Sequence, residues 1–385
     1  MKRKLIKLLS AAVCAAMFFS FSALAAESES PGMPVTVNAK SAILVDVSSG
    51  QVLAAMNEHE RLYPASVTKI MTLLLVMEAI DSGKLNLNDT VVTSPTAAAK
   101  GGSQIWLKEG ESMTVDELLR ATAIYSANDA CEALGEHIAG SEEAFVARMN
   151  ERASELGMKN THFENTNGLD DSVTNHLTSS RDIAIMSREL IKHEKILEFS
   201  SIWMDTIRDG AFGLTNTNRL IRFYKGANGL KTGSTSKALF CMSATAKRDG
   251  MQLIAVIMGA PTRDIRNEEA KKMLDFGFAN YTVYEKEEET FENIKLLGGT
   301  ENMCELYCPP FSTVIEKSGK GNVEICYELP EFLEAPISKG EAIGKVNFVL
   351  NGEKIGEVDI LAKDNINRIG LMELFFKMWK SFFVS

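Results

Sequence analysis

The order in which strand-like and helix-like patterns follow one another most constrains the fold of this chain. Two short runs of β-type residues, Ser41–Val47 and Gln51–Met56, flank a Ser-Ser-Gly turn. Helical periodicity begins at Ser66, and two more strand-like runs, Leu239–Thr245 and Gln252–Met258, come only after the helical stretch. Strands at both ends of a helical block predict an α+β domain, in which one antiparallel sheet, built from both ends of the segment, carries a packed helical cluster.

Local signals define the helices of this block. Apolar residues between Ile70 and Met77 recur on one helix face, and Gly83 ends that helix. Thr114 and Glu117 form a capping box that opens the next helix. Further helices are predicted at about residues 129–138, 142–156, 180–192 and 266–279.

The chain changes character after about residue 282. A charged run, Glu285–Glu289, is followed by segments of alternating polarity at Val323–Tyr327, Lys345–Leu350 and Ile355–Leu361, with turn residues between them. This pattern predicts a small all-β domain, which we assign to residues 283–363. The preceding α+β domain is assigned to residues 36–282.

Residues 364–385 predict a C-terminal amphipathic helix. Its polar side chains form one narrow stripe, which consists of Glu373, Lys377, Lys380 and Ser381. The apolar remainder is shorter than the roughly 20 residues that span a bilayer. A helix of this kind, with Trp379 at headgroup depth, lies in the interface, so we expect a peripheral anchor on a membrane surface. The alternative is a helix docked on the all-β domain.

Residues 1–25 have the organisation of a secretory signal peptide. A basic stretch from Lys2 to Lys7 precedes an apolar one, and Ala23-Leu24-Ala25 matches the small-x-small pattern at a cleavage site. An uncleaved N-terminal anchor is the alternative. Residues 26–35 follow as a polar linker. Export and the C-terminal helix together predict a location on the outer face of the cytoplasmic membrane, facing the cell wall or periplasm.

Composition narrows the classes of partner. The net charge is −10 and the mature part has no long basic run, which argues against nucleic-acid binding. Cys131 and Cys241 lie in apolar patterns and should pack as small hydrophobic residues. Cys304, Cys308 and Cys326 cluster near the C-terminus, where the sequence leaves a disulfide open and, with no histidine nearby, disfavours a zinc site.

Ser66 and Lys69 form the first candidate chemical pair. Positions i and i+3 share a helix face, so the Lys69 amine can reach the Ser66 hydroxyl. A serine hydroxyl becomes a good nucleophile when a neighbouring base takes its proton. A lysine is such a base only if burial or another cation lowers its pKa. The second Ser-x-x-Lys of the chain, Ser234 to Lys237, is taken as coincidental.

Two later motifs complete the set. Ser126-Ala127-Asn128 lies between two helical patterns, where a tight turn lets Ser126 relay a proton and Asn128 hold a substrate amide; a capping turn is the alternative. Lys231-Thr232-Gly233-Ser234 starts the late strands. There a cation can bind a carboxylate and Gly233 can admit a substrate backbone, while the N–H groups of Ser234 and Ser66 can form an oxyanion hole.

Together the three motifs resemble those of the penicillin-binding proteins and β-lactamases, whose signature is Ser-x-x-Lys, Ser-x-Asn and Lys-Thr-Gly. The chain is most similar to the low-molecular-mass D-alanyl-D-alanine carboxypeptidases, the S11 peptidases. Four further features carry this resemblance: the segment 64–72, the loop with Gly102-Ser103 and Leu107–Gly110, the turn Phe163–Leu169, and Arg266 before a charged helix.

The resemblance implies a transpeptidase-type fold and a substrate that ends in D-Ala-D-Ala. Lys231, Thr232 and Arg266 would hold the terminal carboxylate, while Ser66 attacks the penultimate carbonyl and Lys69 acts as its base. The same serine would be acylated by β-lactams, and the chemistry implies no metal or cofactor. Many members have histidine after Lys-Thr-Gly, whereas this chain has Ser234, which should still offer its backbone N–H.

Other activities of the same scaffold stay open on sequence grounds. They are a DD-endopeptidase or transpeptidase, a β-lactamase, and a penicillin sensor without turnover. Glu164 lies where a β-lactamase base could lie, but it lacks the Glu-x-x-Leu-Asn context. Trp106 is expected to pack in the active-site loop or to form a substrate wall. The five histidines show no metal spacing and are expected to be structural or exposed: His59, His137, His162, His176 and His193.

Overall fold

The structure is a computed structural model that describes residues 30–291 and 293–383. The predicted signal peptide, residues 1–25, and most of the predicted linker lie outside the described residues. Of the first compact unit, Met1–Pro31, only two residues are described, so the account below concerns the unit that begins at Gly32.

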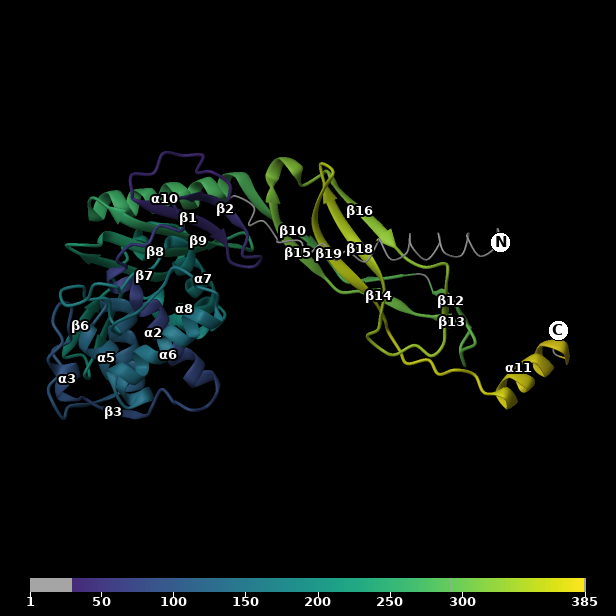
Figure 1. Cartoon of the computed structure of the whole chain (residues 1–385), viewed down its shortest axis with the longest axis horizontal. Coiled ribbons are helices and arrows are strands. Elements are labelled where there is room, and N and C mark those ends of the chain that lie inside the picture. Colours follow the sequence, from purple (N-terminus) through teal and green to yellow (C-terminus); the bar gives the residue numbers. More distant parts are fainter. Residues whose placement is uncertain (1–29, 292, 384–385) are drawn as a thin grey trace, which may run out of the picture. The chain divides into compact units, whose positions relative to one another are not determined.

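A five-stranded antiparallel sheet is the centre of the first domain, as predicted. Its strand order is β2-β1-β9-β8-β7, so the two N-terminal strands pair with the last strands of the domain (Figure 1). The strands are β1 (Ser41–Asp46), β2 (Val52–Met56), β7 (Ala227–Thr235), β8 (Leu239–Arg248) and β9 (Met251–Ala260).

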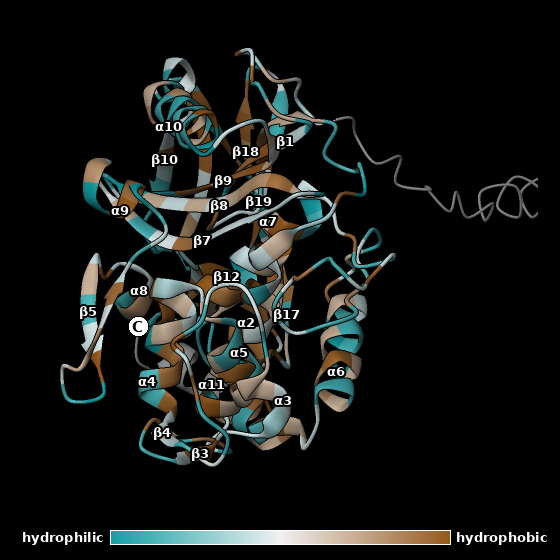
Figure 2. Cartoon of the chain, turned by 90° about the vertical axis from the view of Figure 1, so that its left-hand side faces the viewer, coloured by the Kyte–Doolittle hydropathy of each residue, from teal (hydrophilic) through white to brown (hydrophobic). Residues whose placement is uncertain are grey.

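Each face of the sheet has its own apolar core. Helix α10 (Arg263–Asn280), which begins after the N-cap Thr262, packs its buried Met273 and Leu274 on one face. The helical cluster covers the other face, and Figures 1 and 2 show α10 on one side of the strands with α2 and α5 on the opposite side. The sequence predicted that α10 starts at about Arg266, one turn late. The three residues after the N-cap Thr262 have mixed polarity, and they hide the start of the helical pattern.

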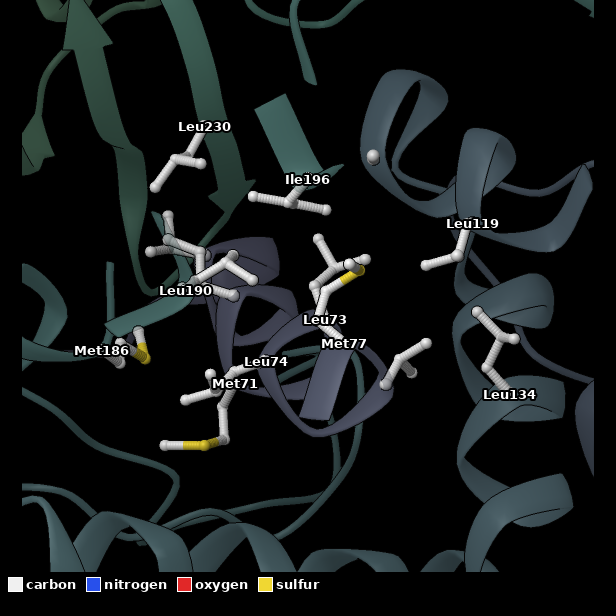
Figure 3. Packing of buried hydrophobic residues seen from close by; sticks show 14 of the residues in the cluster. Met71, Leu73, Leu74, Met77, Leu119, Leu134, Met186, Leu190, Ile196 and Leu230 are labelled. Carbon is white, nitrogen blue, oxygen red and sulfur yellow. The ribbon is translucent and has the colours of Figure 1, made fainter. Parts of the chain in front are cut away.

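Helix α2 (Lys69–Asp81) is the centre of the helical cluster. It continues from a 3-10 turn, η1 (Ala65–Thr68), and residues from Lys69 to Met77 are almost all buried. Figure 3 shows Met71, Leu73, Leu74 and Met77 among apolar side chains from the surrounding elements. A helix that is apolar on nearly all sides must be enclosed, which fixes the position of the Ser-x-x-Lys motif at its start.

Other helices and short hairpins surround α2 and frame the site. The helices are α3 (Pro95–Ala98), α4 (Val115–Arg120), α5 (Asn128–Ala139), α6 (Glu142–Glu155), α7 (Ser180–Ile191), α8 (Lys195–Ser200) and α9 (Leu220–Phe223), with a π-helical turn, η2 (Ala121–Tyr125), after α4. The hairpins pair β3 (Thr90–Val92) with β4 (Ser112–Thr114) and β5 (Met204–Ile207) with β6 (Phe212–Thr215). The predicted capping box of Thr114 and Glu117 is present.

The region after α10 is all β, as predicted. Its largest sheet has the order β11-β14-β19-β18-β16, and two smaller sheets pair β10 with β15 and β13-β12-β17. The strands are β10 (Tyr281–Lys286), β11 (Glu289–Thr290), β12 (Ile294–Leu297), β13 (Met303–Cys304), β14 (Leu306–Cys308), β15 (Phe311–Glu316), β16 (Val323–Glu328), β17 (Phe332–Glu334), β18 (Ala342–Leu350) and β19 (Glu353–Ala362).

The cysteines in the described part of the chain are all free thiols. Cys131 and Cys241 are fully buried, as predicted for small hydrophobic residues. Cys304 and Cys308 are buried in the all-β region and Cys326 is exposed, so the three clustered cysteines form no disulfide in this structure.

Helix α11 (Leu371–Phe383) ends the described chain. The segment before it belongs to the all-β region, because Ile366 is buried and pairs with Ile337 while the Ile369 N–H donates to the Gly298 carbonyl. The helical segment predicted from the sequence, residues 364–385, therefore begins several residues before the helix itself, which starts at Leu371. Within the described residues, no helix is both long enough and apolar enough to cross a membrane.

Candidate active site

The η1 turn presents Ser66 at the start of the central helix. Ala65, just before it, has a positive φ of 49° and turns the chain so that Ser66 is half-buried and Lys69 fully buried. The Lys69 Nζ lies 3.0 Å from the Ser66 Oγ. The contact expected from the i, i+3 spacing is therefore present.

Two further acceptors hold the Lys69 amine. Its Nζ lies 2.5 Å from the Asn128 Oδ1 and 3.0 Å from the Asn167 carbonyl oxygen. Burial lowers the pKa of Lys69 to about 8, against the opposing effects of Cys131 and Asp129. An amine with this pKa is partly neutral near neutral pH, so Lys69 can accept a proton from Ser66.

The turn that supplies the Asn167 carbonyl approaches η1 closely. Asn165 accepts hydrogen bonds from the backbone N–H groups of Asn167 and Gly168. Gly168 has a φ of 88°, and a Cβ at this position would lie 1.9 Å from the Ala65 carbonyl oxygen. Only glycine fits at this position, which explains the glycine in the Phe163–Leu169 turn.

Ser126 connects the second motif to the third. It has a left-handed backbone, with a φ of 68°, and follows the π-helical turn η2. The Lys231 Nζ donates to the Ser126 Oγ over 2.8 Å. The left-handed turn places Ser126 in the cleft although Asn128, two residues later, already belongs to α5.

Asn128 is bonded within the protein at both ends of its amide. Its Oδ1 accepts from Lys69, and its Nδ2 donates to the Gly101 carbonyl over 2.7 Å. The sequence suggested that this side chain holds a substrate amide. In the structure its protein contacts are with Lys69 and with the loop that follows Lys100, and the substrate contact stays a prediction.

Lys231 is the second buried lysine of the site. It lies on β7, and burial and the charge of Lys69 hold its pKa well below the usual value. The sequence left burial and a neighbouring cation open as causes for Lys69. Burial is the main cause for both lysines, and the repulsion between their like charges is mutual. The next residue, Thr232, donates its hydroxyl to Thr217 over 2.8 Å.

Gly233 lies where the β7 strand meets the η1 turn. A Cβ on this residue would lie 2.7 Å from the Ser66 N and 2.9 Å from the Pro64 carbonyl oxygen. The structure thus shows one close approach that requires glycine, with the protein's own nucleophile segment; the approach of a substrate backbone at Gly233 stays a prediction. Glycine lets β7 lie directly against η1, beside the exposed Ser234.

The second Ser-x-x-Lys motif is not part of the site. The Lys237 amine donates to the carbonyls of Asp170 and Val173, and its charge lies 5.2 Å from the Tyr63 ring centre. It therefore fixes a loop outside the cleft.

A cleft of about 410 Å³ opens in front of Ser66. It is lined by Ser66, Ser103, Ser126, Trp203, Thr215, Asn216, Thr217, Arg219, Thr232, Gly233, Ser234, Arg263 and Arg266. Six of the predicted site residues line this cleft: Ser66, Ser126, Thr232, Gly233, Ser234 and Arg266. The two predicted lysines, Lys69 and Lys231, are buried behind its wall. Another cavity, lined by residues such as Leu75 and His137, lies away from these groups.

Arg266 is buried at the edge of this cleft. Its guanidinium donates to the Asn267 Oδ1 over 2.9 and 3.1 Å and to the Cys241 carbonyl over 3.5 Å. Glu269, the acidic residue three positions along the same helix, pairs with Lys272 at 2.6 Å. Burial, together with the charge of Arg263, lowers the pKa of Arg266 to about 10.

Two residues that the sequence analysis gave no catalytic role, His176 and Glu164, make contacts that stabilise the fold. The expectation for Trp106 needs a correction. His176 is buried and accepts the Glu164 backbone N–H at Nδ1, so its Nε2–H donates to the Thr68 hydroxyl, and burial lowers its pKa to about 4. The Glu164 carboxylate accepts from the N–H groups of two loop residues, Thr174 and Asn175. Trp106 was expected to pack, but it is 67% exposed and does not line the cleft.

The sequence did not single out several residues of the cleft. Trp203, Thr217, Arg219 and Arg263 have no motif around them, and only the structure brings them together. Polar Asn216-Thr217-Asn218 before a short helix was the one available signal. Among the described residues, no group of histidine, cysteine or acidic side chains is arranged to hold a metal ion.

Fold and site together define a class, the penicillin-recognising serine enzymes, in which a lysine beside the nucleophile takes the place of a histidine base. Comparisons with known proteins narrow this class. The sequence model of the D-alanyl-D-alanine carboxypeptidases matches residues 25–262, and that of the penicillin-binding protein 5 C-terminal domain matches residues 278–368. The chain belongs to the D-alanyl-D-alanine carboxypeptidase family, and it is a serine-type enzyme of that activity.

Individual relatives cover nearly the whole chain. D-alanyl-D-alanine carboxypeptidase DacF of Bacillus subtilis is 42% identical over 375 residues, which are 95% of this chain and 96% of the relative. DacC of Escherichia coli is 33% identical and covers 94% of this chain and 92% of itself. The crystal structure of penicillin binding protein 5 from Haemophilus influenzae matches 87% of this chain and 99% of its own, with a TM-score of 0.78 and 33% identity.

Proposed function

We propose that this enzyme removes the terminal D-alanine of peptidoglycan stem peptides through an acyl-enzyme on Ser66. The observation that carries the proposal is the position of the Ser66 hydroxyl, at the cleft and 3.0 Å from a buried amine whose pKa is lowered to about 8.

Carboxylate binding comes first in this mechanism. Lys231, Thr232 and Arg266 hold the terminal carboxylate of the substrate. An incoming carboxylate favours the charged form of Lys231, because opposite charges at close range stabilise each other. A charged Lys231 in turn favours the neutral form of Lys69. Substrate binding therefore prepares the base for the next step.

Acylation then uses the neutral Lys69 amine. It takes the proton of the Ser66 hydroxyl as the Ser66 oxygen bonds to the carbonyl carbon of the penultimate D-alanine. The carbonyl electron pair moves to its oxygen, which the N–H groups of Ser66 and Ser234 stabilise. The C–N bond breaks as the tetrahedral centre collapses. The departing nitrogen takes up the proton lost by Ser66, delivered from Lys69 with Ser126 as relay.

Water completes the cycle by hydrolysing the ester. It loses a proton to Lys69 and attacks the carbonyl carbon, the bond to the Ser66 oxygen breaks, and that oxygen recovers the proton.

Asn128 positions Lys69 through its Oδ1 in this proposal, in addition to the substrate contact inferred from the sequence. A β-lactam acylates Ser66 in the same way, since its strained carbonyl replaces that of D-alanine.

The β-lactamase alternative has little support in the geometry. Such an enzyme needs a base that activates the deacylating water quickly. Glu164 is engaged by two backbone N–H groups and does not line the cleft. DacF and DacC are named as carboxypeptidases and the Haemophilus influenzae structure as a penicillin-binding protein, and none of these three is named as a β-lactamase.

The proposed location is outside the cytoplasm, on the membrane surface. The wall substrate implied by the relatives' names and the signal-like N-terminus both support export. In the described part of α11 the apolar side chains are exposed, with Leu371 at 88%. Exposed apolar residues on one short helix support an interfacial anchor. The proposed domains are the α+β domain, residues 36–282, and the all-β domain, residues 283–363. The proposed anchor starts at Leu371.

Release of D-alanine from diacetyl-L-Lys-D-Ala-D-Ala tests the proposed reaction. The purified enzyme should release D-alanine, and Ser66→Ala should lower the rate by about a thousandfold or more. Ser236→Ala is the matched control, because this exposed serine lies outside the cleft and should keep the rate. Equal rates for Ser66→Ala and the unmodified enzyme would overturn the proposal.

A further inference from the structure

Three arginines line the active-site cleft, although the proposed mechanism uses only one of them. Arg219, Arg263 and Arg266 are among its thirteen lining residues, and none of the thirteen is acidic. The chain as a whole has a net charge of −10, so this concentration of positive charge runs against its overall balance. Like charges gathered in one place are unfavourable unless an anion joins them.

Arg263 has no internal partner that would explain its position. Its side chain makes no hydrogen bond or ion pair with any residue in the described ranges, yet it lines the cleft one helical turn before Arg266. The nearness of the two guanidiniums is visible in the pKa of Arg266, which the charges of Arg263 and Arg219 help to lower. Arg263 is exposed, so water solvates its charge unless an anion bound in the cleft takes the place of that water.

Arg219 is only weakly neutralised. Its Nη1 lies 3.6 Å from the Asp264 Oδ1, and the two side chains are 56% and 83% exposed. An ion pair this long and this exposed contributes little. Arg219 therefore remains available to a ligand in the cleft, and Asp264 competes with that ligand.

The position of the cluster decides which part of a substrate it would meet. Arg263 and Arg219 gather next to Arg266, which holds the terminal carboxylate in the proposed mechanism. That carboxylate belongs to the leaving residue, so the two extra cations surround the leaving residue and not the acyl part. D-Alanine has no group for them, because its side chain is a methyl group.

We infer that the enzyme also accepts leaving residues with a second carboxylate, which Arg219 and Arg263 bind. This inference rests on the proposed function and extends it to a further substrate class, D-alanyl peptides with an acidic leaving group. The substrate that carries this chemistry is a free stem peptide that ends in a dicarboxylic D-residue.

Matched peptides test the inference directly. Three substrates share the diacetyl-L-Lys-D-Ala acyl part and end in D-Ala, D-Gln or D-Glu, and kcat/KM is measured from the amino acid released. D-Glu and D-Gln have nearly the same size, so their ratio isolates the charge. We expect D-Glu to exceed D-Gln by about fivefold or more at low salt, from two exposed charge contacts. The ratio should fall as ionic strength rises.

Variants then assign the preference to the arginines. The double variant Arg219→Gln/Arg263→Gln should bring the ratio of D-Glu to D-Gln close to one, whereas Asp264→Asn should raise it. Lys271→Gln removes a cation from the same helix outside this cleft and should leave the ratio unchanged. Penicillin acylation by each variant shows that the fold is intact.

The outcomes separate the inference from the function on which it rests. No release of D-alanine from the D-Ala peptide contradicts the proposed function itself. Release of D-alanine with a ratio near one in the unmodified enzyme overturns the inference alone, and so does a preference that survives in the double variant.

Discussion

At the residue scale, the proposed mechanism depends on two lysine side chains that have almost no contact with water. Lys69 and Lys231 are both buried behind the cleft, and a buried ammonium loses the hydration that stabilises its charge. Each amine is instead bonded to a serine hydroxyl, Ser66 or Ser126. Removing one charge from such a pair stabilises the other, so the site favours one neutral and one charged lysine.

The lowered pKa of Lys69 predicts a pH profile. The base must be neutral, so the acylation rate should rise about tenfold per pH unit below 7, bend near pH 8 and level off above pH 9. An unperturbed lysine, with a pKa of 10.5, would place this bend far higher. Stopped-flow acylation by a chromogenic β-lactam between pH 6 and 9 measures it. A rate that does not change over this range would contradict the assignment of Lys69 as base.

Arg266 predicts a difference between two substrates. Arg266→Ala removes a contact to the terminal carboxylate, so the peptide is positioned less well before attack. The strain of a β-lactam ring compensates for looser positioning, so we expect peptide cleavage to fall by about tenfold or more and penicillin acylation to fall less. The two kcat/KM values, measured in parallel, check this. Unchanged peptide turnover would mean that Arg266 is structural only.

At the scale of elements, the site is a contact between the β7 strand and the η1 turn. β7 carries Lys231 to Ser234, η1 carries Ser66, and Gly233 is where the two backbones meet. The two proposed oxyanion donors come one from each element. Their separation is therefore set by how closely strand and turn pack.

Gly233→Ala tests the importance of that packing. The added Cβ would lie 2.7 Å from the Ser66 N, so strand and turn must separate, at a cost of about 1–3 kcal/mol of stability. Acylation should fall steeply because the oxyanion donors move apart. Gly213→Ala is the control, since a Cβ there meets nothing within 4 Å. Equal acylation rates in the two variants would show that the contact is not needed.

Elements with a periodic pattern could be predicted from the sequence, and contacts between them could not. The sheet strands and α2 could be predicted from their apolar runs and from the period at which apolar residues recur. The contact between Ser66 and Lys69 could be predicted from their i, i+3 spacing on a helix. The left-handed Ser126 and the neighbours of Gly233 depend on how separate elements meet. Arg219 and Arg263 lie far apart in the chain, and their shared cleft depends on the approach of α9 to α10. Trp106 was misjudged because an exposed aromatic residue leaves no signal in the sequence.

At the scale of the whole molecule, the proposed mechanism uses side chains of the α+β domain and none from the described residues of the all-β region or α11. Each proposed catalytic or substrate-binding residue lies between Ser66 and Arg266. The C-terminal parts are thus available for placing the enzyme at a surface.

Truncation after Gly370 tests the proposed anchor. It removes α11 but keeps Ile366 and Ile369, which pair with the all-β region. We expect the truncated enzyme to release D-alanine at the full rate and no longer to sediment with membranes. A truncation after Ile337 would be no control, since it removes β18 and β19 of the core sheet. Continued membrane association with the signal peptide cleaved would rule the anchor out, and loss of folding would favour a docked helix.

The identity of the acylated residue is the most direct test of the whole account. The enzyme is incubated with labelled penicillin and digested, and the adduct is located by mass spectrometry of the peptides. The account predicts one label, on the Ser66 hydroxyl, and none in Ser66→Ala. A label on Ser126 or Ser234, or a label that persists in Ser66→Ala, would contradict it.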